Sequence, residues 1–149
     1  MPLNPKLNQF NQICHFAKYG LEINAERYKS NHSKVQVFML ENDKKSIAIE
    51  VPLWLHSHEL KDYKKYFNSD EPLTGHIDLL RIQDNKIWIW DYKPNAEKEK
   101  FATTQTYFYA LMLSKRTGIP LKHFMCGYFD KNYAFTFKPQ QKHITNLKL

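Results

Sequence analysis

Two strand-like segments joined by a very short polar turn constrain the fold of this chain more than any other feature. Residues 75–82 and 87–93 are rich in Ile, Leu, Trp and Tyr, and only Gln83-Asp84-Asn85-Lys86 separates them. So short a turn places its two flanking strands side by side and antiparallel. The sequence therefore predicts a β-hairpin over residues 75–93.

Two aspartates interrupt these apolar strands. Side chains alternate between the two faces of a strand, so Asp91 and Lys93 share a face at the end of the second strand. Asp78 lies within the apolar run Ile77-Asp78-Leu79-Leu80, and antiparallel pairing can bring it close to Asp91. Two neighbouring carboxylates repel each other unless a cation neutralises them. Hard oxygen ligands of this kind suit Mg²⁺ or Mn²⁺.

The opposite face of the second strand is aromatic. It carries Trp88, Trp90 and Tyr92. These three side chains are expected to form core beneath a helix.

A helix is predicted directly after the hairpin, from Ala96 to Arg116, with Asn95 as its cap and Gly118 just past its end. Gln105 is the polar member of a stripe whose other members are Phe101, Phe108 and Met112. Tyr109 lies one helical turn from Gln105. A glutamine in such a position needs a hydrogen-bond partner, and together with the two strands it is interpreted as aimed at an active centre or at nucleic acid.

The rest of the chain completes an α/β pattern of helix, strands, helix and strands, typical of a sandwich around a mixed sheet. A first helix is expected over residues 7–28, where Phe10, Ile13 and Leu21 contribute to a rough helical period. The other expectations are a hairpin of strands 35–40 and 46–55, a short helix containing Tyr63, Tyr66 and Phe67, strands at 123–129 and 133–138, and a loose basic tail from 139 to 149. One domain over residues 1–149 is the simplest organisation for 149 residues.

Charge and composition favour some functions and disfavour others. The net charge is +7, from 22 Lys and Arg against 15 Asp and Glu, which mildly favours a nucleic-acid partner. The chain has no apolar run of the roughly 18 residues that a membrane helix needs, no signal-peptide core and no Gly-rich phosphate loop for a nucleotide cofactor. With only two cysteines, a reducing, cytoplasmic setting is expected. His56, His58 and His76 match no metal-binding spacing and are interpreted as solvated.

Three motifs in order resemble those of the RecB-like nucleases of the PD-(D/E)XK phosphodiesterase superfamily. They are Gly75-His76-Ile77-Asp78, then Asp91-Tyr92-Lys93, then Gln105-Thr106-Tyr107-Phe108-Tyr109. The resemblance spans about residues 20–138. It implies a restriction-endonuclease-like core, a mixed sheet flanked by helices, and Mg²⁺- or Mn²⁺-dependent cleavage of DNA, with exonuclease action favoured.

The resemblance also implies roles for individual residues. Asp78, Asp91 and the backbone carbonyl of Tyr92 would bind metal, and Lys93 would position water or stabilise the transition state. Gln105 and Tyr109 would support the site, as would Glu50, for which a structural salt bridge is an equal alternative. Contacts to nucleic acid are expected from Lys98, Lys100, Arg27, Lys29 and Lys34.

The sequence departs from the family pattern on the first helix. Asn24 stands where the family often has a metal-binding histidine, and Glu22, Glu26 or His15 are the candidate substitutes. Cys14 and Cys126 are too few for the four-cysteine iron–sulfur cluster of some relatives, so that cofactor is not expected.

Other functions stay open on the residues alone. The fold could serve as a catalytically weak or silent module that binds nucleic acid. It could also be one subunit of a larger DNA-repair or defence complex, or a homo-oligomer. RNA remains an alternative substrate to DNA.

Overall fold

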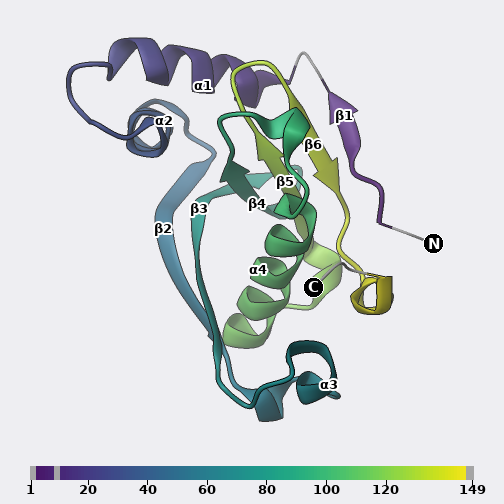
Figure 1. The fold of residues 1–149 in the computed structure, drawn as a ribbon. Coiled ribbons are helices and arrows are strands. Elements are labelled where there is room, and N and C mark those ends of the chain that lie inside the picture. Colours follow the sequence, from purple (N-terminus) through teal and green to yellow (C-terminus); the bar gives the residue numbers. More distant parts are fainter. Residues whose placement is uncertain (1–2, 9–10, 147–149) are drawn as a thin grey trace.

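The computed structural model describes residues 3–8 and 11–146, which form a six-stranded sheet with helices on both faces (Figure 1). The sheet order is β1-β6-β5-β4-β3-β2. The strands are β1 (Lys6–Asn8), β2 (Ser46–Leu55), β3 (Leu73–Gln83), β4 (Lys86–Tyr92), β5 (Phe124–Phe129) and β6 (Ala134–Phe137). The helices are α1 (Gln12–Ile23), α2 (Asn31–Asn42), α3 (Tyr63–Phe67) and α4 (Ala102–Thr117), with short 3-10 turns at 57–59, 96–98, 121–123 and 141–146.

The sheet is mixed, as the sequence predicts. Strands β4 and β5 are parallel, with α4 in the connection between them, and the other neighbouring pairs are antiparallel. The tight turn after Gln83 pairs β3 with β4, with Leu79 opposite Trp90. This register brings Asp78, one residue before Leu79, opposite Asp91, one residue after Trp90.

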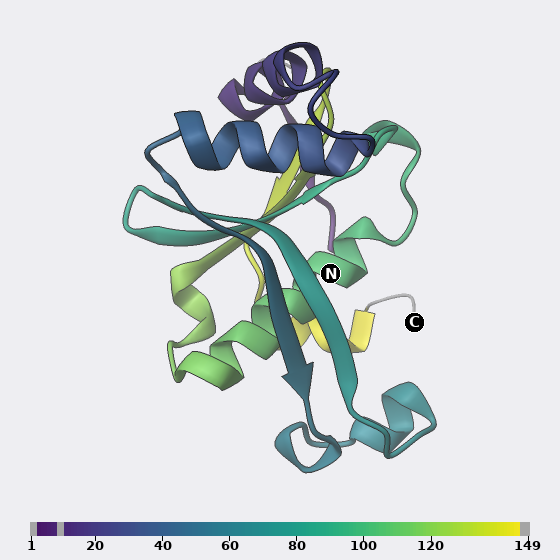
Figure 2. The ribbon, with the colours of Figure 1, turned by 90° about the vertical axis from the view of Figure 1, so that its left-hand side faces the viewer.

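The helices form two layers that bury different cores (Figure 2). Helix α4 covers one face, where its buried aromatic and aliphatic side chains pack with Ile77, Leu80 and Ile89. Helices α1 and α2 cover the other face, and there Trp90 and Tyr92 pack among Ile13, Met39 and other apolar side chains. The prediction that the aromatic face of β4 forms core beneath a helix is therefore confirmed.

The prediction of a strand at 35–40 is wrong, and with it the hairpin to 46–55. Residues 31–42 form α2, whose N-cap is Ser30: its side chain accepts a hydrogen bond from the Ser33 N–H. The run Val35-Gln36-Val37-Phe38 has the β-branched and aromatic composition of a strand. The buried positions Val35, Phe38 and Met39 nevertheless follow helical spacing, and they face the sheet. Tertiary packing outweighed local propensity here.

The first predicted helix is shorter than expected. Residues 6–8 form β1 against β6, and α1 begins only after Asn11, whose side chain caps it by accepting from the Ile13 N–H at 3.0 Å. It ends at Ile23, five residues before the predicted end. Phe10, part of the predicted helical period, lies outside the described residues. Gly20 does not interrupt the helix, because α2 packs closely there: an added Cβ would lie 3.0 Å from the Phe38 Cβ.

The helix predicted from Ala96 starts six residues later, at Ala102. Asn95 makes no side-chain cap. Instead Asp130, at the end of β5, accepts a hydrogen bond from the Ala96 N–H at 2.9 Å and holds this segment against the sheet. The stop signals are correct, since Gly118 adopts the left-handed conformation (φ 74°) just past the end of α4.

The described part of the tail, up to residue 146, also differs from the expected loose segment; residues 147–149 of that prediction lie outside the described residues. Residues 141–146 form a 3-10 turn, Ile144 is buried, and the Tyr107 hydroxyl of α4 donates a hydrogen bond to the Gln140 carbonyl at 2.9 Å. Within the described ranges, no helix is long and apolar enough to cross a membrane.

A buried ion pair ties the end of α2 to the sheet. Arg81 of β3 and Asp43 are 1% and 7% exposed, and the Arg81 Nε and Nη2 atoms donate to the two Asp43 oxygens at 2.7 and 3.2 Å. Burial by itself would raise the pKa of Asp43, but hydrogen bonds from Arg81 and Ser46 and the charge of Arg81 hold it below its ordinary value. This carboxylate therefore stabilises the fold above pH 4, and the contribution is lost as the pH falls through its lowered pKa.

We expect Asp43→Ala to lower the free energy of unfolding by about 3–5 kcal/mol, because it leaves the Arg81 charge buried without its partner. Urea denaturation at pH 7 measures this. Glu41→Ala, which breaks the half-exposed pair with Arg27, is the matched control and should have little effect. Equal losses in the two variants would contradict this account.

Candidate active site

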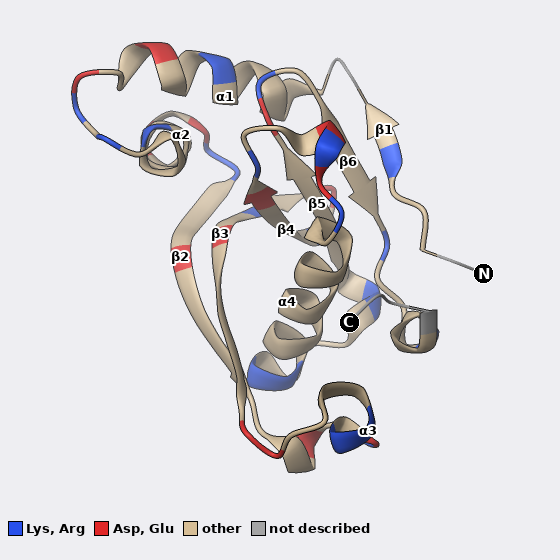
Figure 3. Ribbon diagram, viewed as in Figure 1, with Lys and Arg blue, Asp and Glu red and all other residues tan. Residues whose placement is uncertain are grey.

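Two carboxylates meet on neighbouring strands near the end of β4. The side chain of Asp91 is 4% exposed and that of Asp78 is 14% exposed. The Tyr92 N–H donates a hydrogen bond to Asp78 Oδ2 at 2.9 Å, which draws this side chain toward the end of β4. Figure 3 shows acidic residues on β2, β3 and β4, the three strands that border this site.

The two carboxylates strongly affect each other. Burial, followed by the negative charge of Asp91, raises the pKa of Asp78 to about 8, against the Tyr92 hydrogen bond, which lowers it. The charge of Glu50 adds a smaller contribution in the same direction as Asp91. An acid that resists ionisation this strongly in a folded protein marks a site suited to a positive ligand.

Lys93 provides the nearest positive charge. Its Nζ atom lies 2.9 Å from Asp91 Oδ2, and its side chain is 20% exposed. Burial would lower its pKa, but the charge and hydrogen bonding of Asp91 raise it above the ordinary lysine value, so Lys93 carries its proton at neutral pH. The Lys93 N–H donates to the Phe129 carbonyl at 2.9 Å, which continues the pairing of β4 with β5 and fixes the lysine backbone.

Helix α2 contributes two side chains that the sequence analysis missed. His32, in its first turn, has its Nε2 atom 3.7 Å from Asp78 Oδ2, and its ring contacts the Tyr92 ring edge-on at 5.1 Å. Gln36, one turn later and 3% exposed, donates to the Asp78 carbonyl at 3.0 Å. The available signal was the N-cap Ser30 followed by apolar residues at helical spacing, which would have placed both on one face of a helix.

Glu50 faces the same region from β2. Its Oε1 atom accepts a hydrogen bond from Gln36 Nε2 at 2.7 Å. Its neighbours in β2 pair with Leu79 and Ile77, so it stands opposite Asp78. Its φ of 51° is in the left-handed region, which is unusual inside a strand and costs on the order of 1–3 kcal/mol. Glu50 makes a hydrogen bond rather than the alternative salt bridge in the described structure.

Gln105 and Tyr109 border the site from α4. The Gln105 Nε2 atom donates to the Tyr109 hydroxyl at 2.8 Å, which supplies the partner that a half-buried glutamine needs. The Tyr109 ring packs on Gly75, where an added Cβ would lie 2.5 Å from the ring. A hollow of about 160 Å³ lies beside this pair between β3 and α4, lined by Leu73, Thr74, Gln105, Phe108, Tyr109 and Met112. Phe101, assigned by the sequence to the same stripe, precedes α4 and is 61% exposed.

The three candidate first-helix ligands lie apart from the carboxylates. His15, Glu22 and Glu26 are exposed on α1 and the turn after it, and none contacts Asp78 or Asp91 within the described residues. Asn24, at the position of the family histidine, is 1% exposed and donates to the Lys34 carbonyl at 2.9 Å. It therefore holds α1 to α2, and the histidine near the carboxylates is His32.

The lysines and arginine expected to contact nucleic acid differ in surroundings. Lys98 and Lys100 are exposed in the segment between β4 and α4, whose charged residues are coloured in Figure 3. Lys29 is exposed before α2, and Lys34 is half-buried. Arg27 is paired with Glu41 at 3.1 Å, so part of its charge is already compensated.

Other chemistry-bearing residues lie elsewhere. His56, His58 and His76 are all exposed, and the first two stack their rings 5.6 Å apart. Cys14 and Cys126 are buried in the two different cores on opposite faces of the sheet.

The two carboxylates fit a divalent cation. Asp91 Oδ2 is buried and, apart from its ion pair with Lys93, accepts no well-aligned hydrogen bond in the described structure. Two carboxylates and a nearby backbone carbonyl are typical ligands of Mg²⁺, which keeps several waters and needs few protein groups. No group of three or more His, Cys, Asp and Glu side chains is arranged to hold a metal in residues 3–8 and 11–146. Mg²⁺ bound by one or two carboxylates is generally shared between protein, water and substrate.

Comparison with known families agrees with this geometry. Residues 16–144 match the family model of the PD-(D/E)XK nuclease superfamily. A search of curated proteins found no match. The matched range contains β2 to β6 and all four helices except the first residues of α1, and both carboxylates and Lys93 lie within it. Superfamily membership indicates a metal-dependent nuclease with a restriction-endonuclease-like fold. The chain belongs to the PD-(D/E)XK nuclease superfamily.

Proposed function

We propose that this protein is a RecB-like nuclease that hydrolyses phosphodiester bonds of DNA, with Mg²⁺ or Mn²⁺ as its cofactor and exonuclease action as its mode. The cluster of Asp78, Asp91 and Lys93 is the observation that carries the proposal. At the end of one strand it combines the raised pKa of Asp78, carboxylate oxygens that can bind a metal, and the Lys93 ammonium group held by Asp91.

Asp78, Asp91 and the Tyr92 carbonyl would hold the metal. When bound there, a divalent cation activates water and neutralises charge on the scissile phosphate. His32, next to Asp78, is the helix-borne group that would complete this set.

Lys93 would act directly on the substrate. Its ammonium is kept protonated by Asp91, so it can donate a hydrogen bond to the attacking water or to a phosphate oxygen as charge develops. Asp91 holds the Lys93 side chain in place through the 2.9 Å contact, and this orientation is established before the substrate arrives.

Three other residues would support the site without reacting. Gln36 joins α2 to the Asp78 backbone and to Glu50, so it fixes the spacing between β2, β3 and the helix. Gln105 positions the Tyr109 hydroxyl beside the hollow between β3 and α4, where it can contact the nucleic-acid backbone.

The decisive experiment is a cleavage assay on matched substrates. Purified protein is incubated with Mg²⁺, Mn²⁺, Ca²⁺ or EDTA and with linear and circular, single- and double-stranded DNA, and with RNA of the same sequence. We expect cleavage of linear DNA with Mg²⁺ or Mn²⁺ only, and little cleavage of circles. Cleavage of circular DNA would show endonuclease rather than exonuclease action. Cleavage of RNA alone would overturn the assignment of DNA as the substrate.

A second candidate function is a binding module of this fold without catalysis. The departure on the first helix favours it, because Asn24 stands where the family often has a metal-binding histidine and donates to the Lys34 carbonyl instead. Protein that binds DNA but cleaves no substrate with either metal would establish this alternative.

A further inference from the structure

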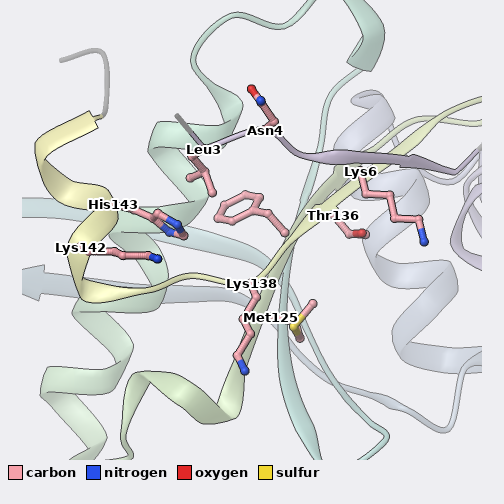
Figure 4. Close-up of a pocket in the computed structure, with 9 residues that line it drawn as sticks. Leu3, Asn4, Lys6, Met125, Thr136, Lys138, Lys142 and His143 are labelled. Carbon is pink, nitrogen blue, oxygen red and sulfur yellow. The ribbon is translucent and has the colours of Figure 1, made fainter. Parts of the chain in front are cut away.

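A second concave surface lies away from the carboxylates, between the N-terminal segment, β6 and the C-terminal turn (Figure 4). This cleft has a volume of about 520 Å³, the largest among the cavities discussed here. It is lined by Leu3, Asn4, Lys6, Met125, Thr136, Phe137, Lys138, Lys142 and His143.

The charge of this cleft is entirely positive. Lys6, Lys138 and Lys142 come from three different segments of the chain and border the same hollow. No acidic residue lines it, and none of the three lysines makes an ion pair within the described part of the chain. Three uncompensated ammonium groups around one cleft attract an anionic ligand.

The rest of the lining is apolar or can donate a hydrogen bond. Leu3, Met125 and Phe137 also line the cleft. His143 accepts a hydrogen bond from the Gln140 N–H through its Nδ1 atom at 3.1 Å. In the neutral ring the proton is then on Nε2, which becomes a donor. Burial, followed by the Lys142 charge, lowers the pKa of His143, so the ring is neutral at pH 7.

The cleft is separate from the catalytic candidates. Met125, at the start of β5, pairs with Trp88, which precedes Asp91 by three residues. At about 3.3 Å per strand residue, this is roughly 10 Å along β4, and the strands that carry Thr136 and Lys6 lie two and three strands of about 4.8 Å each farther across the sheet. A strand of nucleic acid several nucleotides long could therefore contact both places.

We propose that this lysine-lined cleft binds the phosphodiester backbone of a nucleic-acid strand, as a second contact surface beyond the active site. The proposal rests on the proposed nuclease function. Lysine ammonium groups bind phosphates as point charges, and the apolar residues between them can accommodate a sugar or base. The cleft would contact the nucleic-acid strand several nucleotides from the bond that is cleaved, so that the protein binds a longer segment of the strand.

The test compares Lys138→Gln/Lys142→Gln with a matched control, Lys44→Gln/Lys65→Gln, which removes two exposed lysines outside the cleft. Binding of fluorescent single-stranded DNA of 2 and 20 nucleotides is measured in EDTA from low to moderate salt, with circular dichroism as a folding check. A deoxynucleoside monophosphate is added as a competitor in a separate arm. Cleavage by the unmodified protein is measured in parallel.

We expect the cleft variant to bind the 20-nucleotide strand about threefold to tenfold more weakly than the control. Its slope of log affinity against log salt should be shallower by about 1.4, since each lost phosphate contact on a single strand contributes about 0.7. Affinity for the dinucleotide, which is too short to reach both places, should change little, and the monophosphate should not compete.

Four results would overturn the proposal. Equal slopes in the cleft variant and the control would show that the lysines act only through net charge. Competition by the monophosphate at the cleft, with unchanged affinity for the long strand, would make the cleft a small-nucleotide site. If the unmodified protein cleaves DNA while both variants bind like it, the cleft proposal fails and the nuclease proposal stands; if it neither binds nor cleaves nucleic acid, both fail.

Discussion

Lys93→Ala is expected to reduce the rate of DNA cleavage by about 10²–10³-fold, the usual cost of losing one donor that stabilises transition-state charge. Lys93 is the positive side chain in contact with Asp91, at 2.9 Å, and its raised pKa keeps it charged. DNA affinity should fall only slightly, because one contact among several is lost. Single-turnover cleavage and binding in EDTA measure the two effects separately.

The matched control is Lys86→Ala, which removes the same residue type from the opposite end of β4. Lys86 donates to the Lys122 carbonyl at 3.0 Å and lies far from the carboxylates along the strand. Its loss should leave the cleavage rate nearly unchanged. Full activity of Lys93→Ala, with circular dichroism unchanged, would place the active site elsewhere.

Asp78→Asn is expected to abolish cleavage and yet to stabilise the metal-free protein. With a pKa of about 8 in the fold against 3.8 for the free side chain, Asp78 binds a proton in the folded state that the unfolded state releases. Stability of the unmodified protein therefore falls as the pH rises from about 4 to 8. Asparagine removes this charge and can still accept the hydrogen bond from Tyr92.

A tenfold change in proton affinity corresponds to about 1.4 kcal/mol. At pH 8 the free energy of unfolding of metal-free Asp78→Asn should therefore exceed that of the unmodified protein by roughly 2–4 kcal/mol. This difference should shrink toward zero near pH 4, where Asp78 is protonated in both states. Urea denaturation in EDTA across this pH range measures it. Asp84→Asn, in the exposed turn after β3, is the control and should show no such pH-dependent gain.

Bound metal should make the unmodified protein more stable than Asp78→Asn, the reverse of their order without metal. Mg²⁺ or Mn²⁺ bound only to the folded state raises the free energy of unfolding in proportion to the logarithm of its concentration. We expect this stabilisation in the unmodified protein and in Asp84→Asn, and much less in Asp78→Asn. Equal stabilisation of all three by the metal would argue against a site at Asp78.

The sequence alone was sufficient for the β3–β4 hairpin and for the cluster at its end. A short turn fixes the register of neighbouring strands, and the alternation of side chains then decides which residues share a face. Asp78, Asp91 and Lys93 lie within 16 residues of one another, so local geometry could bring them together. The end of α4 at Gly118 and the Gln105–Tyr109 pair follow from equally local signals.

Only the tertiary structure decided how α2 joins the site. Gln36 bonds to the Asp78 carbonyl across 42 residues of sequence, and His32 approaches the same aspartate. The N-cap Ser30 and the apolar spacing could have indicated a helix with both side chains on one face, but the local sequence does not indicate that this face lies against Asp78. The helix forms because its buried side chains pack on the sheet.

Tertiary structure also decided the contacts that hold the ends of these elements. Asp43 pairs with Arg81 across 38 residues, and Asp130 fixes the Ala96 segment across 34. In each case a buried polar group has its partner in a distant part of the chain. An unpaired buried polar group costs free energy, which favours a fold that brings such partners together. The local sequence therefore determined the cluster of Asp78, Asp91 and Lys93, and long-range packing determined which helix and which polar partners surround it.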